Sequence, residues 1–264
     1  MLEHEQKHIS THIEKTAGSS IVKFLFDFYG RRNVMIYSAD TDSLYNADNL
    51  VMLLRFSPHM DKFRNSKVGR ELSPLINGAA INVLRFESQL NNHTKENILS
   101  ENIAAIHGHF SADRFDTLIK NTFKTVILRE PLQRAASHYR YWKTARGVLN
   151  ERINIPYQNN MRFEEFALLD SMQNYQSKAL GTTKIEEFDI VGIAESLESF
   201  ISKFVQMRGQ IKNNKHSNLM HLNASTEYRS CDDESNLNFV KKFKSLNELD
   251  YEIWNKAKLL NNAA

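Results

Sequence analysis

The chain has 264 residues, of which 41% are hydrophobic and 25% are charged. This composition indicates a globular protein with a sizeable core, and it excludes an intrinsically disordered chain. The formal net charge of +3 is smaller than nucleic-acid-binding proteins usually concentrate on one domain. We therefore expect no nucleic-acid partner, and we expect the excess basic residues to contact an anionic ligand locally.

The single cysteine and the absence of long apolar runs bear on where the protein works. Cys231 has no second cysteine with which to form an intrachain disulfide, which favours a reducing compartment. Residues 1–7 do not resemble a signal peptide, and no apolar run is long enough to span a bilayer. We expect a cytoplasmic protein with no stable membrane insertion. Because there is no internal repeat or low-complexity linker, we also expect one domain over residues 1–264.

Strands and helices are predicted to alternate along the chain. A β-branched segment at residues 7–13 predicts a strand, and the apolar residues at helical spacing that follow predict a helix ending at Gly30. Further strands are expected at residues 34–37, 103–110, 125–129 and 188–193. Further helices are expected at residues 132–145, 163–180 and 196–207, and a lysine-rich amphipathic helix is expected to end the chain.

The remaining segments are less regular, but the alternation elsewhere defines a fold class. Loops or stretches without periodicity are expected at residues 38–49, 146–160 and 212–235. Between residues 50 and 100 the pattern does not separate helix from strand. The alternating elements predict an α/β fold with a central, mostly parallel sheet flanked by helices. Ligands bind beyond the carboxyl ends of the strands in such sheets, which is where Lys15, His109 and Arg129 fall.

Residues 12–20 have the composition of an anion-binding loop between a strand and a helix. Unpaired N–H groups and the helix dipole attract anions to a helix start, and Lys15 adds a full positive charge there. Small hydroxyl side chains surround Gly18. In the P-loop of nucleoside triphosphatases, by contrast, the lysine follows the second glycine. Taken alone, these residues leave an anion site and an ordinary turn with a serine N-cap equally open.

A second candidate for anion binding is an arginine at the end of the strand predicted at residues 125–129. Arg129 has the planar guanidinium that suits a phosphate group. Ser137 lies about two turns into the helix that starts at Pro131, close enough to share that phosphate. Arg134 is expected to face outward or to support the loop. The alternative interpretation is an arginine that only forms a salt bridge at a strand end.

His107 and His109 alternate along the strand predicted at residues 103–110. We therefore expect both imidazoles to project from one face, with Gly108 allowing a close approach on the other face. Histidine is the side chain best suited to accept a proton near neutral pH. The alternatives are a pair of structural histidines and a zinc site. Zinc would need a third ligand that the neighbouring sequence does not supply, so we expect no metal.

Three of these segments resemble the sulfotransferases that use 3′-phosphoadenosine 5′-phosphosulfate (PAPS). The resemblance is greatest to the branch that contains the heparan and uronyl 2-O-sulfotransferases and their bacterial relatives. Residues 12–20 resemble the 5′-phosphosulfate loop of that family, and residues 125–139 resemble its 3′-phosphate motif. Residues 106–110 resemble its His-Gly-His segment. The resemblance is specific in the first two segments and runs thinly from about residue 8 to about residue 228.

This resemblance implies a P-loop-like sulfotransferase fold and an in-line transfer of a sulfuryl group from PAPS to an acceptor hydroxyl. It implies an acceptor on a carbohydrate, with a glycan as the partner, and it requires no metal. His109 would be the general base, and His107 would assist it or orient the acceptor. Lys15 would contact the bridging oxygen of the phosphosulfate and stabilise the charge on the leaving phosphate.

The resemblance also implies which residues bind the nucleotide. The 5′-phosphate group would be bound by Thr16, Ala17, Gly18, Ser19 and Ser20. The 3′-phosphate would be bound by Arg129 and Ser137, with Asn223 and Ser225 in a loop over the nucleotide. Glu14 departs from the family pattern, in which proline is commoner. Its carboxylate would lie near a doubly charged group, so we expect it to turn away or to pair with a basic residue.

Two other functions remain to be weighed against sulfuryl transfer. An ATP- or GTP-dependent kinase would need a lysine after the second glycine and an aspartate that binds magnesium, and the sequence offers neither in a recognisable position. A non-catalytic module that binds a nucleotide or a glycan would bind the donor without transferring a group.

Overall fold

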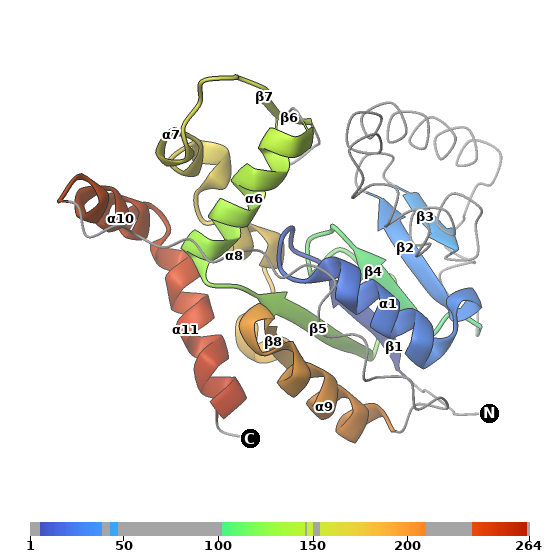
Figure 1. The fold of residues 1–264 in the computed structure, drawn as a ribbon. Coiled ribbons are helices and arrows are strands. Elements are labelled where there is room, and N and C mark those ends of the chain that lie inside the picture. Colours follow the sequence, from blue (N-terminus) through green and yellow to red (C-terminus); the bar gives the residue numbers. More distant parts are fainter. Residues whose placement is uncertain are drawn as a thin grey trace.

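The computed structural model describes residues 6–38, 43–46, 102–145, 147–149, 154–209 and 234–262. Within these ranges, six strands form one sheet in the order β3-β2-β4-β1-β5-β8 (Figure 1). The strands are β1 (Lys7–Thr11), β2 (Val34–Ser38), β3 (Ser43–Asn46), β4 (Ala105–Gly108), β5 (Thr122–Leu128) and β8 (Ile190–Ile193). Neighbouring strands run parallel except β2 and β3, which are antiparallel. The mostly parallel sheet confirms the predicted α/β fold.

Helices cover both faces of this sheet (Figure 1). The α-helices are α1 (Gly18–Tyr29), α6 (Pro131–Ala145), α7 (Phe163–Ala167), α8 (Tyr175–Leu180), α9 (Leu197–Arg208), α10 (Glu234–Leu246) and α11 (Glu248–Asn262). Short 3-10 helices are η1 (Arg31–Asn33), η2 (Asp170–Met172), η3 (Ile185–Glu187) and η4 (Ala194–Ser196). None of the helices in the described ranges has the length and apolar character that crossing a membrane requires.

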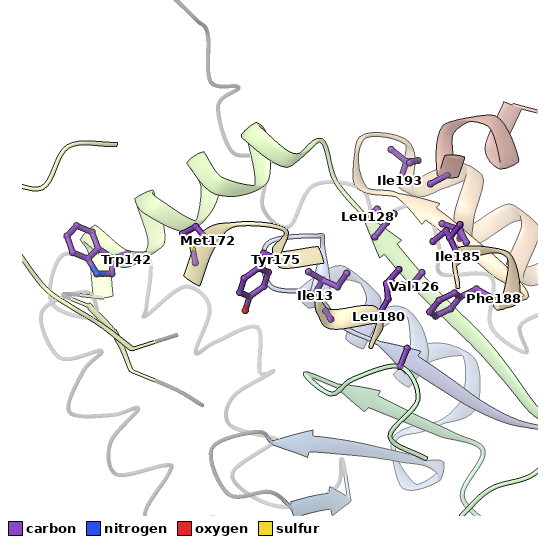
Figure 2. Packing of buried hydrophobic residues seen from close by; sticks show 14 of the residues in the cluster. Ile13, Val126, Leu128, Trp142, Met172, Tyr175, Leu180, Ile185, Phe188 and Ile193 are labelled. Carbon is purple, nitrogen blue, oxygen red and sulfur yellow. The ribbon is translucent and has the colours of Figure 1, made fainter. Parts of the chain in front are cut away.

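The two faces are packed by alternate residues of the central strands. On one face, Ile127 of β5 belongs to a core cluster with Phe24 of α1 and Phe204 of α9, whose rings lie 5.1 Å apart. On the other face, Val126 and Leu128 pack in a cluster that also includes residues of α6, α8 and α11 (Figure 2). Because the end of β5 is buried on both sides, residues 126–128 are consecutively apolar rather than alternating.

Several expected elements differ from the observed ones. The loop expected at residues 38–49 contains strand β3, and the loop expected at residues 146–160 contains an antiparallel pair, β6 (Gly147–Leu149) with β7 (Asn154–Pro156). These strands are only three or four residues long, too short for alternation to be recognisable. The strand expected at residues 103–110 ends at Gly108. The residues left open between 50 and 100, and Cys231, lie outside the described residues.

The helix expected at residues 163–180 is interrupted, and the interruption has a structural role. Asn174 adopts a left-handed backbone conformation, with φ 46°, immediately before α8. Its Oδ1 accepts the backbone N–H groups of Leu249 and Asp250 at the start of α11, at 3.1 and 3.3 Å. The Asp250 carboxylate in turn accepts the backbone N–H groups of Gln176 and Ser177. The two helix starts therefore cap each other, which holds α8 in place beside the sheet.

The terminal helix is also divided. The lysine-rich segment forms α10 and α11, which meet at Asn247 rather than running on as one helix. The Asn247 side chain donates to the carbonyl of Phe243 and accepts the backbone N–H of Asn174. These bonds tie the junction of the two helices to the start of α8.

Candidate functional site

The loop between β1 and α1 makes a tight turn at the carboxyl end of the central strand. Lys15 and Ala17 both have left-handed backbone conformations, with φ 72° and 71°. Such conformations cost about 1–3 kcal/mol each in residues other than glycine and concentrate at functional sites. Thr16 is buried, and its hydroxyl donates a hydrogen bond to the Ile13 carbonyl at 2.9 Å. The Thr16 hydroxyl proton therefore stabilises the turn rather than facing a ligand.

The turn leads directly into α1, whose start faces the end of the sheet. The Ala17 carbonyl accepts the backbone N–H groups of Ser20 and Ile21, at 3.0 and 3.2 Å, and so starts the helix. The amides of Gly18 and Ser19 precede the first intrahelical bonds, and such amides are available to an anion. Ser19 is exposed, whereas Ser20 is buried. Of the two predicted serines, Ser19 is the one open to solvent.

Gly18 is required by a close contact with His12. A Cβ added at Gly18 would lie only 1.8 Å from Nε2 of His12. The His12 ring stacks on His109 at 4.1 Å and on His107 at 5.1 Å between ring centroids. Since this stack leaves the His12 ring little freedom to move aside, glycine is the residue that allows α1 to approach the end of β1.

Lys15 lies in a group of basic residues. Burial, together with the nearby charges of Arg129 and Arg140, lowers the pKa of Lys15 to about 8, whereas the charge of Glu14 opposes the shift. Its Nζ lies 4.4 Å from the centre of the Tyr141 ring, within the range of a cation–π interaction. A lysine held close to two arginines is destabilised by their repulsion. A bound anion would relieve that repulsion.

Arg129 connects this loop to the second predicted motif. Its Nη1 donates to the Lys15 carbonyl at 3.2 Å, and its Nε lies 3.8 Å from Oε1 of Glu195. Gln176 fixes the arginine backbone, because its amide accepts the Arg129 N–H and donates to the Arg129 carbonyl, both at 2.9 Å. The two segments predicted from sequence to bind phosphates are thus in direct contact.

Helix α6 starts after Arg129 and brings further polar side chains to this region. Ser137 is buried in the helix, as is Arg134. The expectation that Arg134 faces outward is therefore wrong: its guanidinium lies 4.2 Å from the centre of the Tyr175 ring, beneath α8. Nη2 of Arg140 is buried and makes no hydrogen bond within the described part of the chain. Such an unsatisfied donor fits an anionic ligand.

The two candidate histidines lie in different environments around His12. His107 is buried, its Nδ1 forms a 2.9 Å hydrogen bond with the Ser10 hydroxyl, and burial lowers its pKa to about 3. His109 lies beyond the end of β4 and keeps 29% of its side chain exposed. Gly108 allows a close approach as expected, but the approaching atom is the Tyr37 carbonyl oxygen of β2, 2.4 Å from an added Cβ. Only His109 of this pair is open to an acceptor.

Glu14 takes part in the site through its side chain. Its Oε1 lies 3.4 Å from Nδ1 of His109, and its Oε2 accepts a hydrogen bond from the Tyr175 hydroxyl at 2.5 Å. The carboxylate therefore pairs with a basic residue, which was one of the two expectations for this position.

Asn223 and Ser225 lie outside the described residues. Among the residues that are described, no group of three or more His, Cys, Asp or Glu side chains has an arrangement that could hold a metal ion.

Three contributors were not predicted from the sequence, namely His12, Arg140 and the pairing of Glu14 with Tyr175. Arg140 follows Ser137 at i+3 on one helix, so helical spacing could have placed it on the same face. No local pattern could have connected Glu14 to Tyr175, because 161 residues separate them.

The site thus combines two features at one edge of the sheet. One is a group of three basic side chains at a helix start, which can bind a multiply charged anion and stabilise charge that develops on it. The other is a partly exposed histidine next to a carboxylate, and this histidine can accept a proton. Together they fit the transfer of a charged group to a hydroxyl.

Comparison with known proteins agrees with this chemistry. No curated protein matches the chain. The family model described as "Sulfotransferase family" matches residues 1–257, which is nearly the whole sequence. The match includes both candidate anion-binding segments and His109, which lies between them in the sequence. The chain therefore belongs to the sulfotransferase family.

Proposed function

We propose that this protein transfers a sulfuryl group from PAPS to a hydroxyl of a carbohydrate, with His109 as the general base. Membership of the sulfotransferase family supports sulfuryl transfer in general, and members of that family generally take the group from PAPS. The observation that carries the proposal is the hydrogen bond from Arg129 to the Lys15 carbonyl, because it joins the two segments that resemble donor-binding motifs.

In this proposal, the basic residues bind the donor and stabilise the leaving group. Lys15 and the N-terminus of α1 would hold the 5′-phosphosulfate, and Arg129 with Ser137 would hold the 3′-phosphate. Arg140 lies close enough to influence both Lys15 and Arg129 electrostatically. As the bond between sulfur and the bridging oxygen breaks, its electron pair remains on the phosphate oxygen. Lys15 would stabilise that charge, which is electrostatic catalysis by preorganised groups.

His109 would take the proton of the attacking hydroxyl. A carbonyl oxygen can only accept a hydrogen bond, so the 3.0 Å contact between His109 Nδ1 and the His12 carbonyl puts the proton of the neutral ring on Nδ1. The lone pair is then on Nε2, where it can accept the hydroxyl proton. A carbohydrate acceptor is proposed from the resemblance of residues 106–110 to the 2-O-sulfotransferases.

Transfer of radiolabelled sulfate tests the proposal directly. The protein would be incubated with ³⁵S-labelled PAPS and a panel of glycans and small alcohols, without added metal, and labelled product would be separated and counted. Labelled glycan is the expected result. Phosphate transfer that requires ATP and magnesium would instead indicate a kinase, and PAPS binding without transfer to any acceptor would indicate a binding module.

A histidine variant separates donor binding from transfer. His109→Ala should bind 3′-phosphoadenosine 5′-phosphate, the desulfated product, as tightly as the wild type, since no basic residue of the donor site is changed. Its kcat should fall by about 100-fold or more, as expected when a general base is removed. Unchanged turnover would exclude His109 as the base.

A further inference from the structure

Glu14 lies between the candidate base and a buried tyrosine. Its two oxygens have different partners, because Oε1 is 3.4 Å from His109 Nδ1 and Oε2 accepts the Tyr175 hydroxyl at 2.5 Å. The side chain of Glu14 is only 14% exposed. A carboxylate held from both sides in a poorly hydrated position interacts more strongly with a nearby charge than one in bulk water.

Tyr175 gives this carboxylate a fixed anchor. The tyrosine is buried on α8, its ring is covered by the Arg134 guanidinium at 4.2 Å, and α8 is capped by Asp250 of α11. The hydroxyl of Tyr175 therefore has a position set by the core rather than by the loop. Through it, the loop residue Glu14 is oriented by a rigid part of the fold.

The same nitrogen of His109 contacts both the His12 carbonyl and Glu14. The carbonyl, at 3.0 Å, fixes the proton of the neutral ring on Nδ1, and the carboxylate lies close to that N–H. When the ring gains a second proton at Nε2 it becomes a cation, and the negative charge of Glu14 then stabilises it. This arrangement favours the imidazolium, which forms when His109 acts as a base, over the neutral ring.

We propose that Glu14 is a positioning residue for His109, and that it holds the imidazole with Nε2 toward the acceptor and stabilises the imidazolium formed during transfer. This inference rests on the proposed function. During the reaction the acceptor oxygen forms its bond to sulfur while sulfur loses its bond to the bridging phosphate oxygen. The acceptor proton moves to Nε2 of His109, and Glu14 itself gains no proton.

Other charged and titratable groups surround this pair and contribute to its pH dependence. They are His12, Lys15, His107, Arg134, His138 and Tyr175. Lys15 and Arg134 are cations that oppose protonation of a neighbouring histidine. Glu14 is the carboxylate among the groups named here. Removing its charge should therefore change the pH dependence in the direction opposite to the change caused by removing the charge of Lys15.

The variant Glu14→Gln tests the inference because glutamine keeps the shape and removes the charge. We expect kcat to fall by about 10- to 100-fold, as when the partner that orients a histidine is lost. We expect the acid limb of the pH–rate profile to move to lower pH, because a neutral partner no longer favours the imidazolium. Because Glu14 also raises the pKa of the neighbouring Lys15, affinity for 3′-phosphoadenosine 5′-phosphate is compared below pH 7, where Lys15 is a cation and donor binding should persist in Glu14→Gln.

Two further variants control for charge and folding. Glu252→Gln removes the same charge from an exposed position on α11 and should leave the acid limb in place. Glu14→Asp keeps the charge but withdraws it by one methylene, so its kcat should lie between those of the wild type and Glu14→Gln. A wild-type kcat and an unmoved acid limb in Glu14→Gln would overturn the inference. If Glu14→Gln does not fold, a wild-type kcat in Glu14→Asp would overturn it.

A measurement without substrate separates this inference from the proposed function. The ¹⁵N NMR signals of the His109 ring report which nitrogen is protonated and at what pH the ring titrates. We expect the Nδ1–H form in the wild type, and a titration at lower pH in Glu14→Gln. An unmoved titration would overturn the role of Glu14 even if the enzyme is active. Conversely, a moved titration in a protein that transfers no sulfuryl group would overturn the proposed function alone.

Discussion

The guanidinium of Arg129 donates a hydrogen bond to the backbone carbonyl of Lys15, at 3.2 Å. The two residues are separated by 114 positions in the sequence and follow the carboxyl ends of two adjacent parallel strands, β1 and β5. The contact places a guanidinium and an ammonium group at the start of α1, where a helix terminus already favours anions. Four predictions follow from the charges and the close packing of this region.

Donor affinity should depend on pH through Lys15. Burial, with help from Arg129 and Arg140, lowers the pKa of Lys15 to about 8. Below pH 8 the side chain is a cation that would bind the donor's phosphate in the proposed function, and above pH 8 it loses its proton. Affinity for 3′-phosphoadenosine 5′-phosphate, measured by calorimetry, should therefore fall as the pH rises from 7.5 to 9.5. Lys15→Arg stays charged over this range and should abolish the fall; an equal fall in that variant would contradict the assignment.

Removing Arg140 should change the same pH profile in a defined direction. The charge of Arg140 helps to lower the pKa of Lys15, so Arg140→Gln should raise that pKa toward its ordinary value of 10.5. The midpoint of the alkaline loss of affinity should then move to higher pH. Affinity at pH 7 should fall by about 3- to 10-fold, because one of the cations that face the anion is gone. A midpoint that stays in place would show that Arg140 does not act on Lys15.

Replacing Arg129 by lysine should not be conservative. Lysine keeps the charge but lacks the planar fork that can contact the Lys15 carbonyl and a phosphate together. Affinity for 3′-phosphoadenosine 5′-phosphate should fall by about 10-fold or more, the cost of losing a hydrogen bond to a charged group. Arg162→Lys is the matched control, because Arg162 is exposed and pairs only weakly with Glu165 at 3.6 Å. Equal affinities in the two variants would argue against a donor-binding role for Arg129.

A methyl group at Gly18 should disturb the site through His12. In Gly18→Ala the added Cβ would lie 1.8 Å from the His12 ring, so either the ring leaves its stack or α1 shifts. We expect a loss of about 1–3 kcal/mol in the free energy of unfolding, measured with urea, and a weaker donor affinity. Gly209→Ala serves as a control. Its φ of 92° makes alanine unfavourable, but Gly209 follows α9 near the start of β1, at the opposite edge of the sheet. The Gly209→Ala variant should therefore lower the free energy of unfolding without changing donor affinity.

Local sequence predicted the parts of this protein that depend on short-range patterns. Consecutive apolar residues mark β2 and the end of β5, and helical spacing with Gly30 marks α1, so the α/β class and most elements could be predicted. The short strands β3, β6 and β7 were missed because three or four residues carry too little pattern. The break before α8 was missed because Asn174 is held by bonds to residues of α11, more than 70 positions away.

The same division between short-range patterns and long-range contacts applies to the site. Residues 12–20 and 125–139 were predicted as anion-binding segments because helix starts and arginines at strand ends can bind anions through local geometry and because both segments resemble donor-binding motifs. Composition alone left ordinary structural roles open. Only the tertiary structure decided which histidine is exposed and what Glu14 contacts. Those features depend on long-range packing: β4 ends at Gly108, His12 stacks on His109, and the core holds Tyr175 against Glu14. Charge and burial at these contacts are set by side chains distant in the sequence, which no local pattern contains.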